Sequence, residues 1–139
     1  MAEHFTVVFP VHPRTRGNID KFGFKGQIEN IKNIVLTNPL GYIDFLKLVK
    51  ESKVVITDSG GIQEETTFLS IPCLTIRSTT ERPVTISEGS NTLLDMDEKL
   101  ILDEIQKILD NKYKSGKIPR LWDGKASERI VSVTADYLK

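Results

Sequence analysis

Short apolar runs alternate with amphipathic segments along almost the whole chain. Strands are predicted where β-branched and aromatic residues cluster: 5–9, 33–37, 54–57, 73–77 and 92–94. Helical spacing of apolar residues predicts short helices near 15–24, 41–51, 61–70 and 82–88, and longer ones after Asp97 and from about Lys125. Strands separated by helices of this length form right-handed βαβ units. We therefore expect an α/β fold, a Rossmann-like parallel sheet with flanking helices.

Composition and charge narrow the class of protein. The 139 residues are 39% hydrophobic and 27% charged, which is typical of one globular domain. Lys and Arg equal Asp and Glu in number, so no basic excess favours nucleic acid or a membrane surface as partner. The single cysteine, Cys73, excludes an internal disulfide, and we expect it to be buried. The first residues show no signal-peptide pattern, which favours a cytoplasmic location, and His4 is given no role.

The run Asp58-Ser59-Gly60-Gly61 separates a predicted strand from a predicted helix. Glycines let a ligand approach the backbone, and the first N–H groups of a helix attract anions. The run matches neither the dinucleotide fingerprint nor the Walker pattern, so no NAD or ATP loop, no cofactor and no metal site is predicted. Two interpretations stay open: a phosphate-binding turn, or a tight turn whose aspartate or serine caps the helix.

Two adjacent acids, Glu64 and Glu65, follow in the same helix. We expect Ile62, Thr66 and Leu69 to form the inward stripe of that helix. Glu65 then lies close to the stripe and needs a partner, which ribose hydroxyls could supply, because an unpaired buried carboxylate is costly. Glu64 is expected to point nearly opposite Ile62.

Other polar residues also follow predicted strands. His12, Asn38, Ser59 and Arg77 each come after a strand, and ligands of such sheets bind beyond the carboxyl ends of the strands. We therefore expect them to converge on one rim. His12 is either a structural hydrogen-bonding group or a phosphate donor. Arg77 and Arg82 either bind phosphate or, with Glu81, cap and pair at a helix start.

Four motifs in order and at matching spacing resemble one family. They are Pro10–Pro13, Asp58–Glu65, Thr80–Pro83, and Asp123–Ile130, which resembles the ending asp-gly-x-ala-x-x-arg-ile. Together they resemble the C-terminal domain of the non-hydrolysing UDP-N-acetylglucosamine 2-epimerases, and the resemblance covers nearly the whole chain.

The resemblance implies the C-terminal half of a glycosyltransferase-B-like two-domain enzyme. Such an enzyme interconverts UDP-N-acetylglucosamine and UDP-N-acetylmannosamine, by elimination and re-addition of UDP, for cell-surface polysaccharide biosynthesis. By motif, Ser59, Gly60 and Gly61 would hold the pyrophosphate and Glu65 the ribose. His12 and Arg82 would face the phosphates or the sugar, and both are the candidate catalytic residues.

The resemblance also implies that catalysis needs a second domain. The proton-transferring carboxylate of the family belongs to an N-terminal domain that 139 residues cannot also contain. We therefore expect one nucleotide-binding domain over residues 1–139, from a shortened or split protein, inactive as an epimerase by itself. The apolar face of the last helix, Ile130, Val133 and Tyr137, predicts a homodimer.

Three alternatives remain. The chain could be the donor-nucleotide domain of a UDP-sugar glycosyltransferase, part of a hydrolysing epimerase, or a non-catalytic nucleotide-binding module that acts with a partner chain. The Ser59–Glu65 run and Thr80–Pro83 favour the non-hydrolysing epimerase over the glycosyltransferase.

Overall fold

The computed structural model describes residues 5–139, so His4 lies outside the described residues. The chain divides into two compact units, one up to Leu48 and one from Val49 onward, and each is described by itself. A single domain over residues 1–139 stays a prediction. No helix among residues 5–139 is long and apolar enough to cross a membrane.

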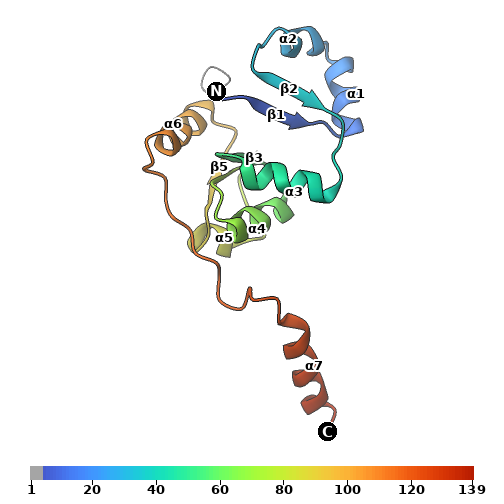
Figure 1. The fold of residues 1–139 in the computed structure, drawn as a ribbon, viewed down its shortest axis with the longest axis vertical. Helices are drawn as coiled ribbons and strands as arrows, with labels where there is room; N and C mark the ends of the chain where they lie inside the picture. The colour runs from blue at the N-terminus through green and yellow to red at the C-terminus, as the bar shows by residue number, and fades with distance from the viewer. Residues whose placement is uncertain (1–4) are drawn as a thin grey trace. The chain divides into compact units, whose positions relative to one another are not determined.

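The first unit is built on two parallel strands, β1 (Val7–Pro10) and β2 (Ile34–Thr37), shown side by side in Figure 1. Helix α1 (Pro13–Lys21) begins with proline in its first turn, where the missing N–H is no loss. The sequence placed this helix at 15–24, too late at both ends. Gly23, at a φ of 72°, ends it in the left-handed region that glycine tolerates. A second short helix, α2 (Lys25–Glu29), was not predicted.

The second unit carries a three-stranded parallel sheet in the order β3-β4-β5. Helix α3 (Tyr42–Glu51) leads into it across the boundary between the units. The strands are β3 (Val55–Thr57), β4 (Cys73–Ile76) and β5 (Asn91–Leu94). The helices are α4 (Gly60–Leu69), α5 (Pro83–Ser87), α6 (Glu98–Leu109) and α7 (Ala126–Tyr137). The predicted α/β class with parallel strands and flanking helices is confirmed, although the described strands pair as two sheets.

The helix ends agree with local chemistry. The Asp97 side chain caps α6 by accepting from the backbone N–H of Leu100 at 3.1 Å, as predicted. Helix α4 ends at Ser70, whose φ of 57° is left-handed. The segment between α6 and α7 is irregular, as its polar sequence predicts. Helix α7 has no buried residue.

The interior of the second unit is unusually polar. Its buried apolar residues are Val49, Cys73, Leu74, Leu94 and Ile105. Its buried polar residues are more numerous: Thr57, Gln63, Thr66, Thr67, Thr75, Thr85, Ser90 and Asn91. Because buried polar groups need hydrogen-bond partners, their positions are fixed more strictly than those of apolar residues. These residues gather beside α4, the helix that opens with the two glycines.

Candidate functional site

The first turn of α4 lies directly after β3, as the sequence predicts. Ser59 is the N-cap residue, but its side chain makes no capping hydrogen bond. Its backbone N–H instead donates to Thr57 Oγ1 at 3.0 Å. Gly60 and Gly61 are the first two helical residues, and Ser59 and Gly61 are exposed. The positive end of a ten-residue helix whose second residue, Gly61, is exposed is suited to bind an anion.

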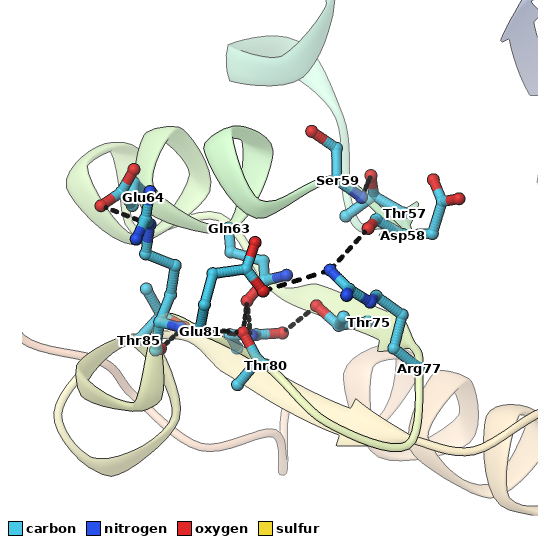
Figure 2. A network of polar contacts seen from close by, with 12 residues as sticks. Thr57, Asp58, Ser59, Gln63, Glu64, Thr75, Arg77, Thr80, Glu81 and Thr85 are labelled. Carbon is cyan, nitrogen blue, oxygen red and sulfur yellow. Dashed lines mark hydrogen bonds and ion pairs between the residues drawn. The ribbon is translucent and has the colours of Figure 1, made fainter.

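A carboxylate already lies against this turn. A Cβ built on Gly60 would stand 2.5 Å from Glu81 Oε1, so the glycine leaves room for that side chain. Arg77 Nη1 contacts Glu81 Oε2 at 3.2 Å and reaches the carbonyl oxygen of Asp58 at 3.5 Å (Figure 2). A hydrogen bond from its own backbone N–H, and the charges of Arg77 and Arg82, hold the pKa of Glu81 below its usual value. The turn therefore accepts negative charge with an arginine beside it.

A second ion pair joins α4 to the start of α5. Arg82 Nε lies 3.0 Å from Glu64 Oε1, although its N–H is not directed at that oxygen, so we treat the contact as charge attraction. Both side chains are about two-fifths exposed, which keeps the pair screened and weak. From the sequence we expected Glu64 to point away from the inward stripe of α4. Glu64, rather than Glu65, forms this bridge.

The inward stripe of α4 was predicted only in part. Thr66 is buried, as expected, but the other buried residues of the helix are Gln63 and Thr67. Ile62 and Leu69, predicted as the rest of the stripe, are only half-buried. On this face the Gln63 side chain bonds to Asn91 of β5, whereas Thr66 Oγ1 donates to the carbonyl oxygen of Ile62 in its own helix. Apolar periodicity cannot detect such a polar face. Glu65 is half-buried, as the sequence predicts.

Five side chains form what we call the polar network: Gln63, Thr75, Thr80, Thr85 and Asn91. At its centre Asn91 Nδ2 donates to Gln63 Oε1 at 3.2 Å, and both side chains are 0% exposed. Thr75 Oγ1 donates to Asn91 Oδ1 at 2.7 Å, and Thr80 Oγ1 donates to Gln63 Oε1 at 2.6 Å. Figure 2 shows Gln63 reaching from α4 toward the loop that carries Thr80.

Gln63 and Thr80 lie in two of the motifs quoted above, but the sequence assigns no role to any residue of the polar network. Thr75 lies inside an apolar strand and Asn91 at a strand start, where they resemble ordinary strand and turn residues. One signal was available, because Gln63, Thr66 and Thr67 stand at i, i+3 and i+4, the spacing of one helix face. Cys73 was predicted correctly as buried, and burial raises its pKa.

His12 belongs to the first unit. It is the N-cap residue of α1, and its Nδ1 accepts from the backbone N–H of Arg14 at 3.3 Å. The imidazole is exposed, so this weak local bond leaves it available to a ligand. Ser59 and Arg77 do follow neighbouring strands of one sheet, β3 and β4. A common rim for all four strand-end residues, His12 and Asn38 included, stays a prediction.

Comparison with known proteins places this geometry in a family. Residues 1–135 match the family described as UDP-N-acetylglucosamine 2-epimerase. The chain is 41% identical over 128 residues to the UDP-N-acetylglucosamine 2-epimerase of Methanocaldococcus jannaschii, covering 91% of this chain and 34% of that protein. It is 35% identical to the UDP-2,3-diacetamido-2,3-dideoxy-D-glucuronate 2-epimerase of Pseudomonas aeruginosa, covering 95% of this chain and 34% of that protein.

A solved structure agrees with the sequence relatives. The crystal structure of the Methanocaldococcus jannaschii UDP-GlcNAc 2-epimerase, in complex with UDP-GlcNAc and UDP, superposes with a TM-score of 0.82 at 35% identity. The match covers 94% of this chain and 35% of that one. The chain thus spans about a third of the length of the relatives it matches. With the family matched over nearly all of its residues, the chain belongs to the UDP-N-acetylglucosamine 2-epimerase family.

Proposed function

We propose that this chain is the UDP-binding part of an enzyme that interconverts UDP-N-acetylglucosamine and UDP-N-acetylmannosamine. The observation that carries the proposal is the first turn of α4, where Gly60 leaves room for the Glu81 carboxylate, Arg77 balances its charge and Gly61 is exposed. A diphosphate is an anion of the kind that such a turn and its arginines bind. The relative from Methanocaldococcus jannaschii, crystallised with UDP-GlcNAc and UDP, supports this choice of ligand.

The proposed contacts follow from charge and exposure. The backbone N–H groups of Gly60 and Gly61, with the Ser59 hydroxyl, hold the diphosphate. Arg82, at the start of α5, faces the phosphates or the sugar, because guanidinium groups match phosphate oxygens in geometry. Glu65, half-buried on α4, accepts from the ribose hydroxyls. His12 is carried over from the family motif alone, as a proposed donor to a phosphate or the sugar.

In the proposed reaction this chain acts on the leaving group. Removal of the proton at sugar C2 and departure of UDP from C1 give a glycal-like intermediate. UDP then returns to C1 on its original face and a proton returns to C2 on the opposite face, so only C2 is inverted. Negative charge develops on UDP as the bond to the sugar breaks. Donors and cations already aimed at the diphosphate stabilise that charge without rearranging. The group that takes the C2 proton is assigned to the part of the enzyme outside this chain, so the chain alone is expected to be inactive.

Calorimetric titration of the chain with UDP tests the binding site. UDP should bind, uridine should bind far more weakly, and the amide signals of Ser59, Gly60 and Gly61 should shift. A Gly61→Ala variant should lower the affinity about tenfold, because its Cβ separates the backbone from the diphosphate. Gly26→Ala is the matched control, because both glycines are helical and have open space where the Cβ would stand. Equal affinity for UDP and uridine would overturn the proposal.

Activity is tested separately. The purified 139-residue chain should give no UDP-N-acetylmannosamine, and measured turnover would refute the assignment of proton transfer to another part of the enzyme. A protein that also contains the rest of the family's length should convert the sugar without an acceptor, which distinguishes an epimerase from a glycosyltransferase. Free UDP in that assay would indicate a hydrolysing enzyme. The second sugar to test is UDP-2,3-diacetamido-2,3-dideoxy-D-glucuronate, which the name of the Pseudomonas aeruginosa relative gives as its substrate.

We also propose a homodimer and a cytoplasmic location. The apolar residues of α7 support association, since Ile130, Val133 and Tyr137 are 64%, 69% and 88% exposed. Exposed apolar surface of this kind is commonly covered by a partner. Sedimentation at rising concentration should show self-association, and Ile130→Asp should weaken it. A strict monomer at high concentration would contradict the dimer.

A further inference from the structure

The backbone of Arg82 is held on both sides by the polar network. Its N–H donates to Thr80 Oγ1 at 3.1 Å. Its carbonyl oxygen accepts from Thr85 Oγ1 at 2.7 Å and from the Thr85 backbone N–H at 3.0 Å. One threonine thus holds the amide and the other holds the carbonyl of the residue assigned to the diphosphate.

The two threonines are in turn held by the two buried amides. Thr80 donates to Gln63 Oε1, and Thr85 accepts from Asn91 Nδ2 at 3.1 Å. Gln63 and Asn91 are bonded to each other, so the two supports are not independent. Each hydroxyl has one proton to donate. Thr80 donates its proton to Gln63 Oε1, and Thr85 donates its proton to the carbonyl oxygen of Arg82. Both threonines are therefore fixed in direction as well as in position.

The guanidinium also makes one weak, partly exposed contact with α4. Glu64, which follows Gln63 on α4, contacts Arg82 through Nε. This contact engages one side of a planar group that carries five N–H donors, and the terminal amino groups are suited to paired phosphate oxygens. A residue with a fixed backbone and a guided side chain loses little freedom when it binds a ligand.

One detail indicates that the network serves more than stability. Among the described residues, Gln63 Nε2 is buried without a hydrogen-bond partner. A buried amide N–H left unpaired is unfavourable by about 1–3 kcal/mol, and an apolar residue there would avoid the loss. Only an amide or acid offers the oxygen that Thr80 and Asn91 share.

We propose that Thr80 and Thr85, oriented by the Gln63–Asn91 pair, are positioning residues that aim Arg82 at the diphosphate of UDP. The proposal rests on the proposed function, because Arg82 matters only if an anion binds. It predicts that the hydroxyl of Thr80 affects UDP binding through Arg82 and through no contact of its own.

A double-mutant cycle in the full chain tests the proposal, with UDP affinity measured by calorimetry. Thr80→Val keeps the shape of the side chain but removes the hydroxyl, and it should weaken UDP binding about tenfold. Thr80→Ser keeps the hydroxyl and should stay within about twofold. In an Arg82→Ala background, Thr80→Val should have an effect below about twofold, because the residue it positions is gone. An equal loss in both backgrounds would overturn the proposal.

Amide hydrogen exchange provides a readout that does not depend on UDP. The Arg82 N–H should exchange faster in Thr80→Val than in Thr80→Ser, while amides of β4 keep their wild-type rates. Unchanged exchange at Arg82 would contradict the proposed support even if affinity fell. Should Thr80→Val unfold, Thr85→Val and Thr85→Ser form the second pair, with the same expected order of affinities. A wild-type chain that does not bind UDP would instead refute the proposed function, and exchange would still test the support.

Discussion

Two regions hold the β3-β4-β5 sheet by different chemistry. The polar network joins side chain to side chain, from Asn91 and Thr75 in the strands to Gln63 in α4. A second region, residues 113–117, which we call the clasp, joins side chains to backbone carbonyls. Tyr113 Oη lies 3.0 Å from the carbonyl oxygens of Cys73 and Ser90, and Lys114 Nζ donates to the carbonyls of Ile86 and Asn91.

The polar network and the clasp differ in how many residue types they require at particular positions. Every residue offers a carbonyl oxygen, so most partners of the clasp can be any residue. The exception is Thr92, whose Oγ1 lies 2.7 Å from Tyr113 Oη. The network constrains both ends of each bond, because a hydroxyl must meet an amide oxygen in one geometry. A clasp is sufficient to hold a strand. The polar network requires a particular side chain at each of five positions. This requirement indicates that the positions of the atoms beside the first turn of α4 are important.

The largest effect is expected when the centre of the network is removed. Asn91→Leu preserves the approximate volume but leaves Gln63, Thr75 and Thr85 without a shared partner. The free energy of unfolding should fall by about 3 kcal/mol or more, because unpaired buried polar groups are costly. Urea unfolding followed by circular dichroism measures it. Asn18→Leu on the exposed face of α1 is the control and should change stability by less than about 0.5 kcal/mol. Similar values for both variants would show that the network does not stabilise the sheet.

The next effect tests the clasp where its backbone is closest to the sheet. A Cβ added to Gly116 would stand 2.5 Å from the carbonyl carbon of Gly89 and would also meet the backbone nitrogen of Ser90. Backbone cannot move aside as a side-chain end can, so Gly116→Ala should destabilise the fold by about 2 kcal/mol. Gly17→Ala, in open space within α1, should instead stabilise it by about 0.5–1 kcal/mol. A neutral Gly116→Ala would mean that the clasp is loosely attached.

A pH effect distinguishes the two regions, because the clasp contains a buried phenol. Burial raises the pKa of Tyr113 to about 12, from 10.0. Between pH 10 and about pH 12, Tyr113 therefore keeps its proton in the folded state and has lost it in the unfolded state. The tyrosine contribution to stability is therefore full below pH 10 and is lost as the pH rises toward about 12.

Tyr113→Phe should remove that part of the alkaline loss, while lowering stability at neutral pH by about 1 kcal/mol through the missing hydrogen bonds. Two neighbours also titrate in alkali. Burial raises the pKa of Cys73 from 9.0, which adds a loss of stability above pH 9. Burial lowers the pKa of Lys114, which acts in the opposite sense. Urea unfolding at a series of alkaline pH values, in wild type and Tyr113→Phe, measures the difference. Parallel curves would contradict a buried Tyr113.

The sequence predicted the elements well where the local pattern determines them. Strands β1 to β5 and helices α3 to α7 lie within about two residues of their predicted bounds because apolar periodicity and caps such as Asp97 act locally. Helix α2 was missed because five residues are too few to show a period.

The sequence predicted less of the site, because the site depends on pairing at a distance. The turn at Ser59, Gly60 and Gly61 was predicted correctly because a strand-to-helix turn is a local signal, and its role in binding stays a prediction. The bond from Gln63 to Asn91 spans 28 positions, and no single-sequence period connects them. The approach of Glu81 to Gly60 spans 21 positions, so local sequence indicates a ligand as the reason for the glycine and gives no sign of the carboxylate.

Gly60 leaves room both for Glu81 and for the proposed diphosphate. Its substitution has the smallest expected effect on stability. Its added Cβ, like that of Gly116, would meet an atom at 2.5 Å, but here the atom is Glu81 Oε1, at the end of a flexible side chain. Glu81 can rotate away, and alanine favours the helix, so Gly60→Ala should change stability by less than about 0.5 kcal/mol. UDP affinity should nevertheless fall about tenfold, because the Cβ separates the diphosphate from the backbone. Glu81→Gln in the Gly60→Ala background should not restore it. A loss of stability as large as in Gly116→Ala would mean that Glu81 is held rigidly, and the turn would then be closed to a ligand.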